Sequence, residues 1–245
     1  MSAQPQSHSI SLAECNAAEV NQRLRNWDTT TNGSNISITQ ANSGRANSAD
    51  ASLTAANSTA ANCVQGFAAG LNRTLTIQIT GDLGDFAFML NEQAEIELNG
   101  NIGSSAGHSL SSGYLLINGN AGDNFGAYAT GGVIACIGRA GARCGLGLAG
   151  GDVIVRSEVG DEAALGMMGG TLILGNSVGD HLGAGMRGGT VYVRGAVKSL
   201  APGIREYRLK ESDTMRLSLL LARAGIRAAA KEFRVYRAST SGGVA

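Results

Sequence analysis

The most regular feature of the chain is a pattern of apolar residues that recurs every 19 residues. Each unit holds an apolar pair separated by one residue, as in Ile96 and Leu98. Side chains two residues apart lie on the same face of a β-strand. The sequence therefore predicts one short strand per unit, with its apolar pair facing inward. The other pairs in register are Ile77/Ile79, Leu115/Ile117, Ile134/Cys136, Val153/Val155, Leu172/Leu174 and Val191/Val193.

Glycine recurs with the same period. One set, the anchor glycines, comprises Gly84, Gly103, Gly122, Gly141, Gly160 and Gly179. A second set follows ten residues after the anchor in five of the six units, as at Gly132. Glycine is favoured where the backbone takes a positive φ or where two backbones approach closely. We therefore expect the anchor glycines to form corners that hold the fold, with a positive φ at positions such as Gly122.

A unit of 19 residues is too short to bury its own apolar face, whereas stacked units bury theirs along a common axis. Strands separated by one whole unit run in the same direction. The repeat therefore predicts an all-β fold, a parallel β-helix of about seven rungs over residues 75–198.

The residues before the repeat fall into two segments. Residues 1–40 are predicted to form a small α+β lead-in, with a helix over residues 17–25 behind an Asn16 cap and a strand over residues 36–39. Residues 41–70 are predicted to be a low-complexity insertion rich in Asn, Ala and Ser. Such a composition buries little apolar surface, so we expect no packed core from it.

The residues after the repeat, 199–245, are predicted to form a helical cap and a basic tail. The repeat register ends at Lys198, and an uncovered last rung would leave unpaired backbone groups at its edge. Ser212 and Asp213 precede an apolar helical stretch that ends at Gly225, which fits an N-cap, a helix and a C-terminal glycine. We expect this helix to cover the last rung.

Charge is divided along the chain although the formal net charge is zero. The residues up to Gly195 carry nine Lys/Arg and fifteen Asp/Glu, a net of −6, and those from Ala196 on carry ten and four, a net of +6. Such a division favours oriented association, so the basic region is predicted to dock an acidic partner surface through Arg216, Arg223 and Arg227. The alternative interpretation is a solvated face over the apolar helix. This region has few aromatic residues on which bases could stack, so nucleic acid is not an expected partner.

Composition predicts a cytoplasmic protein without membrane contact. No apolar run approaches the ~18 residues of a membrane-spanning helix, and the first residues hold no basic segment followed by an apolar one. The four cysteines are scattered and form no C-x-x-C pair, as expected for reduced thiols in the cytoplasm.

Two kinds of short motif match known sites, but both coincide with glycines of the repeat. Gly145–Gly150 and Gly183–Gly188 fit the dinucleotide motif G-x-G-x-x-G, yet neither opens a helical pattern. Gly103–Gly107 fits the G-x-S-x-G motif of serine hydrolases, which requires a strand before it and a helix after it. The residues that follow have no helical pattern. We therefore assign no catalytic or cofactor-binding residue to these motifs.

Acidic residues and histidines are the candidate metal ligands. Asp85, Asp123, Asp161 and Asp180 each follow an anchor glycine. They predict either a ladder of cation ligands or Gly-Asp turns at solvated corners. We favour the turns, because the nine-residue repeat of calcium-binding β-rolls does not occur. The histidines share no column of the repeat and have no zinc-ligand spacing, so no metal ligand is assigned.

Two stretches of the repeat resemble a known family. One is Gly122-Asp123-Asn124-Phe125-Gly126, followed by Gly131-Gly132, and the other is Gly179–Gly195. They are similar to the G-x-G-x-G repeat domain that closes the large subunit of glutamate synthase. In that family the domain is also a separate chain in split complexes, including N-methylglutamate synthase, and it occurs in the C subunit of formylmethanofuran dehydrogenase. The resemblance implies that the parallel β-helix is right-handed.

In the glutamate synthase family the chemistry belongs to other domains. Glutamine hydrolysis uses an N-terminal cysteine nucleophile, whereas this chain begins Met1-Ser2. Glutamate formation uses FMN and an iron–sulfur cluster, whereas the cysteines here are not clustered. The resemblance therefore implies a non-catalytic structural subunit that binds no cofactor itself. Its expected partners are a class II glutamine amidotransferase subunit and an FMN-dependent synthase subunit, which would carry the FMN and the iron–sulfur cluster.

Two alternatives stay open beside this hypothesis. The chain could be the C subunit of a formylmethanofuran dehydrogenase-like formyltransferase/hydrolase complex, or a free-standing structural β-solenoid. The segments at residues 19–24 and 219–221 are more similar to the glutamate synthase branch than to the formyl branch, which favours the first hypothesis.

Overall fold

The computed structural model describes residues 8–11, 17–26, 35–39 and 65–239. Its strands form one 11-stranded sheet in the order β1-β2-β3-β4-β5-β6-β7-β8-β9-β11-β10. They are β1 (His8–Ser11), β2 (Asn35–Thr39), β3 (Thr76–Thr80), β4 (Glu95–Asn99), β5 (Tyr114–Ile117), β6 (Thr130–Cys136), β7 (Gly150–Val155), β8 (Thr171–Leu174), β9 (Thr190–Val193), β10 (Ile204–Tyr207) and β11 (Arg234–Ala238). The helical elements are α1 (Ala17–Arg25), α3 (Glu211–Arg223) and a 3-10 turn, η1 (Ala230–Glu232). The predicted Asn16 cap and the tract of residues 41–62 lie outside the described residues.

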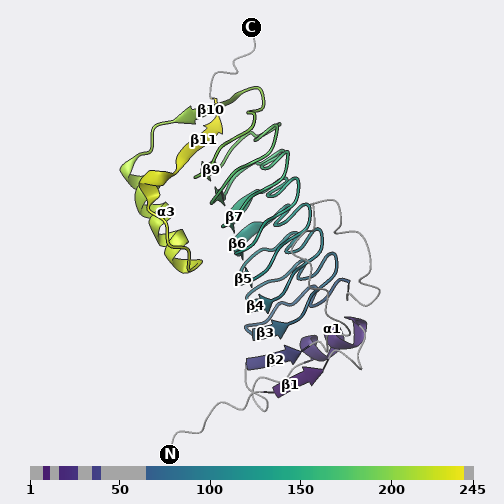
Figure 1. Ribbon diagram of the computed structural model, residues 1–245. Helices are drawn as coiled ribbons and strands as arrows, with labels where there is room; N and C mark the ends of the chain where they lie inside the picture. The colour runs from purple at the N-terminus through teal and green to yellow at the C-terminus, as the bar shows by residue number, and fades with distance from the viewer. Residues whose placement is uncertain (1–7, 12–16, 27–34, 40–64, 240–245) are drawn as a thin grey trace, which may run out of the picture.

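The repeat folds as a parallel β-solenoid, which confirms the predicted fold class. Strands β3 to β9 are seven parallel rungs, and each pairs with the next in a 19-residue register, as Ile77 with Ile96, apart from an irregularity between Thr130 and Val133 of β6. Figure 1 shows the coils stacked along one axis, with these strands on one flank. A second column of parallel bridges joins the residues before the anchor glycines, from Leu83 to Val197.

The apolar pairs face the interior, as the alternation predicted. Their side chains are buried in one continuous core that runs along the axis of the stack. Aromatic side chains fill the turn side of the first coils, where the rings of Phe67 and Phe88 meet edge to face at 6.0 Å between centroids. Each coil therefore contributes a thin layer of core and depends on its neighbours for burial.

The stack begins further toward the N-terminus than the 19-residue period indicated. Strand β2 pairs in parallel with β3, with Ile36 opposite Ile77, and β1 pairs in parallel with β2. Ile36 and Ile38 are buried in the same core as the repeat. Residues 65–70 form a turn of the stack, which places Phe67 in that core. The period could not reveal β2, because Ile36 precedes Ile77 by 41 residues.

The predicted C-terminal helix is present as α3, but its start and its place differ from the prediction. It begins at Glu211, and its N-cap is Lys210, whose backbone N–H donates to the Asp213 carboxylate at 3.0 Å. It is followed by Gly225 at a φ of +67°, as expected for a C-terminal glycine. The helix lies on the outward face of the sheet rather than over the last rung. Strand β11 occupies that edge, antiparallel to β9, and β10 pairs with β11 (Figure 1).

The anchor glycines form corners, but the reason is close approach and not a positive φ. None of the six has a φ in the left-handed region, so the expectation for Gly122 was wrong. A Cβ atom on Gly122 would lie 2.7 Å from the backbone nitrogen of Ser104 in the preceding coil. One on Gly160 would lie 2.8 Å from the backbone nitrogen of Ala142. Neighbouring coils therefore touch backbone to backbone at these corners.

A single methyl group at such a corner should separate two coils. We expect Gly122→Ala to lower the free energy of unfolding by about 3 kcal/mol, because backbone atoms cannot move aside as a flexible side chain would. Gly166→Ala is the matched control. Gly166 has a φ of +63° with no atom within 4 Å of an added Cβ, and Tyr128 takes a φ of +54° at the same repeat position. This control should cost only about 1 kcal/mol.

Urea denaturation of both variants measures the difference. An equal loss of stability, or a larger one for Gly166→Ala, would show that the close approach of the coils is not the constraint at the anchor glycines.

Candidate functional site

The G-x-S-x-G match is part of the repeat geometry. Ser105 is buried and has a φ of +59°, but Asn124 and Arg143 take φ values of +57° and +56° at the same repeat position. The left-handed serine is therefore a feature of every coil rather than a nucleophile held on a special turn. His108 Nδ1 lies 2.8 Å from Ser109 Oγ. No histidine within the described ranges hydrogen-bonds the Ser105 hydroxyl.

The aspartates that follow the anchor glycines link one coil to the next. The Asp85 carboxylate accepts the backbone N–H of Ser104 at 2.7 Å, and the Asp161 carboxylate accepts that of Asp180 at 2.7 Å. Asp123 accepts the N–H of Ala142 at 2.8 Å in the same way. Asp85, Asp123 and Asp161 each begin a turn segment, as the Gly-Asp turn interpretation predicted, but their carboxylates bond to the neighbouring coil and not within the turn. In the described part of the chain, no group of three or more His, Cys, Asp or Glu side chains could hold a metal ion.

Two free thiols are buried inside the stack. Cys136 takes the inward position on β6 that the sequence predicted, and Cys144 lies in the same core. Burial raises the pKa of Cys136 to about 12, and burial also raises the pKa of Cys144. Thiolates are the reactive form of cysteine, so these two side chains act as small core residues.

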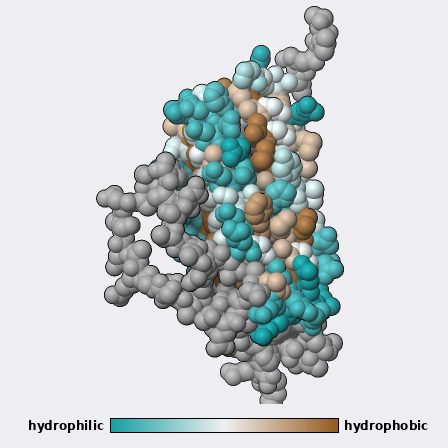
Figure 2. All heavy atoms as spheres, turned by 90° about the vertical axis from the view of Figure 1, so that its right-hand side faces the viewer, coloured by the Kyte–Doolittle hydropathy of each residue, from teal (hydrophilic) through white to brown (hydrophobic). Residues whose placement is uncertain are grey.

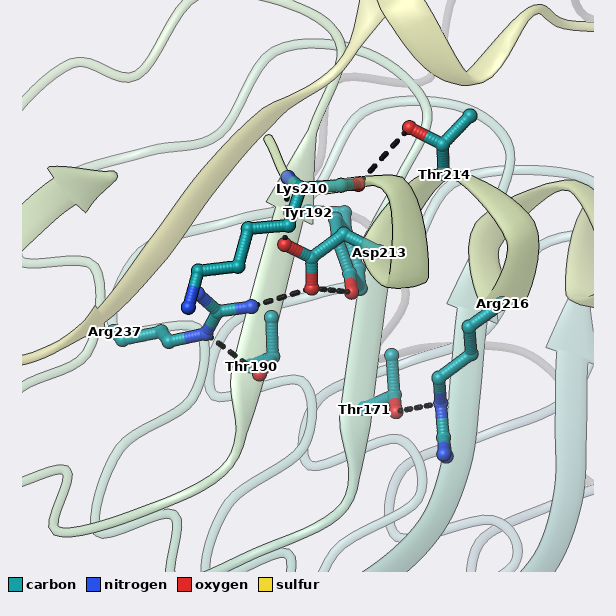
Figure 3. A network of polar contacts seen from close by, with 8 residues as sticks. All are labelled: Thr171, Thr190, Tyr192, Lys210, Asp213, Thr214, Arg216 and Arg237. Carbon is teal, nitrogen blue, oxygen red and sulfur yellow. Dashed lines mark hydrogen bonds and ion pairs between the residues drawn. The ribbon is translucent and has the colours of Figure 1, made fainter. Parts of the chain in front are cut away.

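A network of polar contacts lies where α3 meets β9 and β11 (Figure 3). Asp213 of α3 is at its centre and is only 7% exposed. One carboxylate oxygen accepts the hydroxyl of Tyr192 at 3.0 Å and forms an ion pair with Arg237 of β11. The other oxygen accepts the backbone N–H of Lys210 at 3.0 Å. The network therefore joins the start of α3 to two strands of the sheet.

The electrostatics of the network match a structural role. Burial on its own would raise the pKa of Asp213, but the N–H of Lys210, the hydroxyl of Tyr192 and the guanidinium of Arg237 outweigh it, and the pKa is lowered. Burial, the hydrogen bond to Asp213 and its negative charge raise the pKa of Tyr192 to about 12. At neutral pH the pair is an ionised carboxylate and a neutral phenol, each already bonded to the other. Such a pair holds two elements together and does not transfer a proton to a ligand.

Further polar contacts and a second apolar core fix α3 along the sheet. The Arg237 Nε donates to Thr190 Oγ1 at 3.1 Å, and the Arg216 Nε donates to Thr171 Oγ1 at 3.1 Å (Figure 3). Arg216 also pairs with Asp152 of β7 at 2.7 Å. The second core joins outward residues of β6 to β9 to the helix and to β11; it includes Val133, Ala135, Ile154, Ile173, Tyr192, Leu217, Leu220, Leu221, Phe233 and Val235.

The three arginines predicted to dock a partner are not equivalent. Arg216 is engaged with Asp152 and Thr171 of the sheet. The guanidinium carbon of Arg223 lies 5.3 Å from the ring centroid of Tyr114, whose hydroxyl donates to the Arg223 carbonyl at 3.1 Å. Two of the predicted docking residues therefore help to hold α3 in place, and only Arg227 is exposed without such a contact.

Sequence reasoning missed the outward side of α3. Met215 is 72% exposed and Leu219 is 69% exposed, and they are the two most exposed large apolar side chains of the described residues. They lie four residues apart and therefore form one ridge along the helix, here named the α3 ridge. Large apolar residues occur on two sides of this helix, and that distribution is the sequence signal that could have identified the α3 ridge.

Neither a scan of protein-family models nor a search of curated proteins gives a match to the chain. No helix among the described residues combines the length and the apolar character needed to cross a membrane. The class of protein is therefore defined by the fold itself: a repeat protein of stacked parallel β-coils, with a helix fixed to the outward face of its sheet.

The lowered pKa of Asp213 predicts an acid-sensitive attachment of α3. A carboxyl group whose pKa is lower in the folded chain than its unfolded value of about 3.9 adds stability at neutral pH, and that stability is lost as the pH falls through the folded pKa. Asp213→Asn removes the titrating group. We expect it to cost about 3 kcal/mol near neutral pH, because Arg237 is left without its partner.

Urea denaturation at neutral pH and at about pH 2.5 tests this linkage. The wild-type chain should lose more stability on acidification than Asp213→Asn does. Tyr192→Phe is the control, because it keeps the carboxylate and should cost about 1 kcal/mol near neutral pH. Parallel losses in the wild type and Asp213→Asn would contradict the proposed role of the carboxylate.

Proposed function

We propose that the chain is a non-catalytic structural subunit of a glutamate-synthase-like amidotransferase complex. In this proposal it positions a class II glutamine amidotransferase subunit and an FMN-dependent synthase subunit, so that ammonia passes between them. The support from sequence is the resemblance of residues 122–126 and Gly179–Gly195 to the repeat domain of that family. The support from structure is the parallel solenoid itself, the fold that the resemblance implies.

The observation that carries the proposal is the presence of exposed apolar side chains on two separate flanks. One flank bears the α3 ridge, Met215 and Leu219. On the turns, Phe86, Leu90 and Tyr128 are between 46 and 55% exposed. Figure 2 shows the flank away from α3, where apolar side chains are exposed among hydrophilic ones. A subunit that holds two partners needs two such surfaces, and exposed apolar surface of this kind is typical of interaction sites.

The solenoid is well suited to fix the distance between two partners. Every coil is hydrogen-bonded to the next through the strands, the bridge column and the turns. The second core and the Asp213 network fix α3 to this stack. The stack and α3 therefore move little relative to one another, so partners bound on the two flanks would be held at a fixed distance. The expected FMN and iron–sulfur cluster belong, in this proposal, to the synthase partner.

One observation favours the alternative of a free-standing structural solenoid. The C-terminal edge of the stack is already covered by β11 and β10, and α3 covers the outward face of the last strands. The chain thus needs no partner to protect that end. The complex subunit would have partner proteins bound on its exposed flanks, whereas the free-standing solenoid would not.

Co-expression with a class II glutamine amidotransferase subunit and an FMN-dependent synthase subunit tests the proposal. We expect one co-eluting assembly with glutamine-dependent synthase activity, and loss of that activity when this chain is omitted. If the chain elutes alone and the activity of the other two subunits does not depend on it, the free-standing solenoid is the better account. Co-elution with formyltransferase and hydrolase subunits instead would support the formyl-transferring complex.

A further inference from the structure

Helix α3 has two apolar faces, of which only one is covered. Its inner face buries Leu217, Leu220 and Leu221 in the second core. Its outer face carries the α3 ridge, Met215 and Leu219, at 72% and 69% exposure. A helix that packs on a sheet requires one apolar stripe, and its other side is normally polar. Within the part of the chain that the structure describes, no element covers the second stripe, so the fold of these residues does not explain it.

The α3 ridge is held in a fixed orientation. The Asp213 network anchors the first turn of the helix, and Arg216 bonds to Asp152 and Thr171 near its middle. At the other end, Tyr114 hydrogen-bonds the Arg223 carbonyl. The helix cannot rotate to bury the ridge without breaking these contacts. A surface that is already ordered loses less conformational entropy when it binds a partner.

Positive charge surrounds one end of the ridge. Arg223 follows Leu219 by four residues, which continues the same line along the helix, and Arg227 lies just beyond the helix end. Within the described residues, neither arginine has a carboxylate within ion-pair distance. Asp213, by contrast, is buried and paired with Arg237. The surface thus consists of an apolar ridge next to cations that have no anionic partner.

We propose that the α3 ridge is the docking site for an amphipathic helix of a partner subunit, with acidic residues beside its apolar stripe. The ridge would pack into the groove between side-chain rows of that helix, as in ordinary helix–helix contacts. Its carboxylates would pair with Arg223 and Arg227. This inference rests on the proposed function, because it names the chemistry of the partner at one of the two flanks.

A helix that is acidic fits this surface better than a second copy of the chain. Two copies packed through α3 would bring together two C-terminal regions with a net charge of +6 each. Like charges facing one another oppose association. An extended strand is also a poorer occupant, because the backbone N–H and C=O groups of α3 are used within the helix and offer no ladder to a strand.

The test uses the purified full chain and the partner subunit that co-elutes with it. Met215→Ser with Leu219→Ser should weaken binding by about 100-fold, because two central apolar contacts are lost. Arg227→Glu should weaken it by about tenfold at low salt and by less at high salt, where charges are screened. Arg205→Glu, on the exposed side of β10 at the C-terminal edge of the sheet, is the matched control and should bind as the wild type does. Thermal unfolding of each variant verifies that the fold is intact.

A photo-crosslinker at Leu219 identifies the occupant. Capture of a partner segment with an apolar stripe and flanking Asp or Glu confirms the inference. Capture of a second copy of this chain, or of a basic segment, overturns it. If the wild-type complex forms and the ridge variants bind it unchanged, the ridge inference is wrong while the proposed function stands. If the wild-type chain joins no complex, both are wrong.

Discussion

The structure depends on one steric constraint, the contact of neighbouring coils at the anchor glycines. A Cβ atom at Gly122 would lie within 2.7 Å of the backbone of the coil before it. Because the coils meet there, Leu83 and its successors form a column of parallel bridges, and the aspartates that follow the glycines reach the backbone of the adjacent coil. The distance between coils that is set at the anchor glycines is the same for each rung, and the inward apolar pairs therefore stack in register.

Much of this fold could be predicted from the sequence, because the constraint repeats. The alternation of Ile96 and Leu98 and its 19-residue recurrence predicted the parallel strands and the inner core. The reason why the anchor positions require glycine could not be predicted. Sequence alone does not distinguish a residue with a positive φ from one at which two backbones approach closely. The 19-residue period did not predict β1 and β2 as rungs, because a long segment separates β2 from β3.

The outward face of the sheet carries a sequence signal for the helix that covers it. In β3 and β4 the residue between the inward pair is Gln78 or Glu97, whereas in β8 and β9 it is Ile173 or Tyr192. A strand that is apolar at three successive positions is buried on both faces. This indicates that a further element covers the later coils, and α3 is that element. The bonds that join Asp213 to the sheet had no comparable signal, because Tyr192 and Arg237 lie 21 and 24 residues from Asp213 and share no period with it. The α3 ridge in turn depends on this attachment, since the anchored helix directs Met215 outward.

Native-state hydrogen exchange measures the central claim most directly, that contact at the anchor glycines joins the coils into one cooperative body. The amide of Gly122 donates to the Ile102 carbonyl at 3.0 Å, and that of Gly160 to the Ala140 carbonyl at 3.2 Å. We expect both amides to exchange only through global unfolding, and those of α3 to exchange through a separate opening of lower free energy. Exchange of the Gly122 and Gly160 amides through local openings, faster than the amides of α3, would contradict the account.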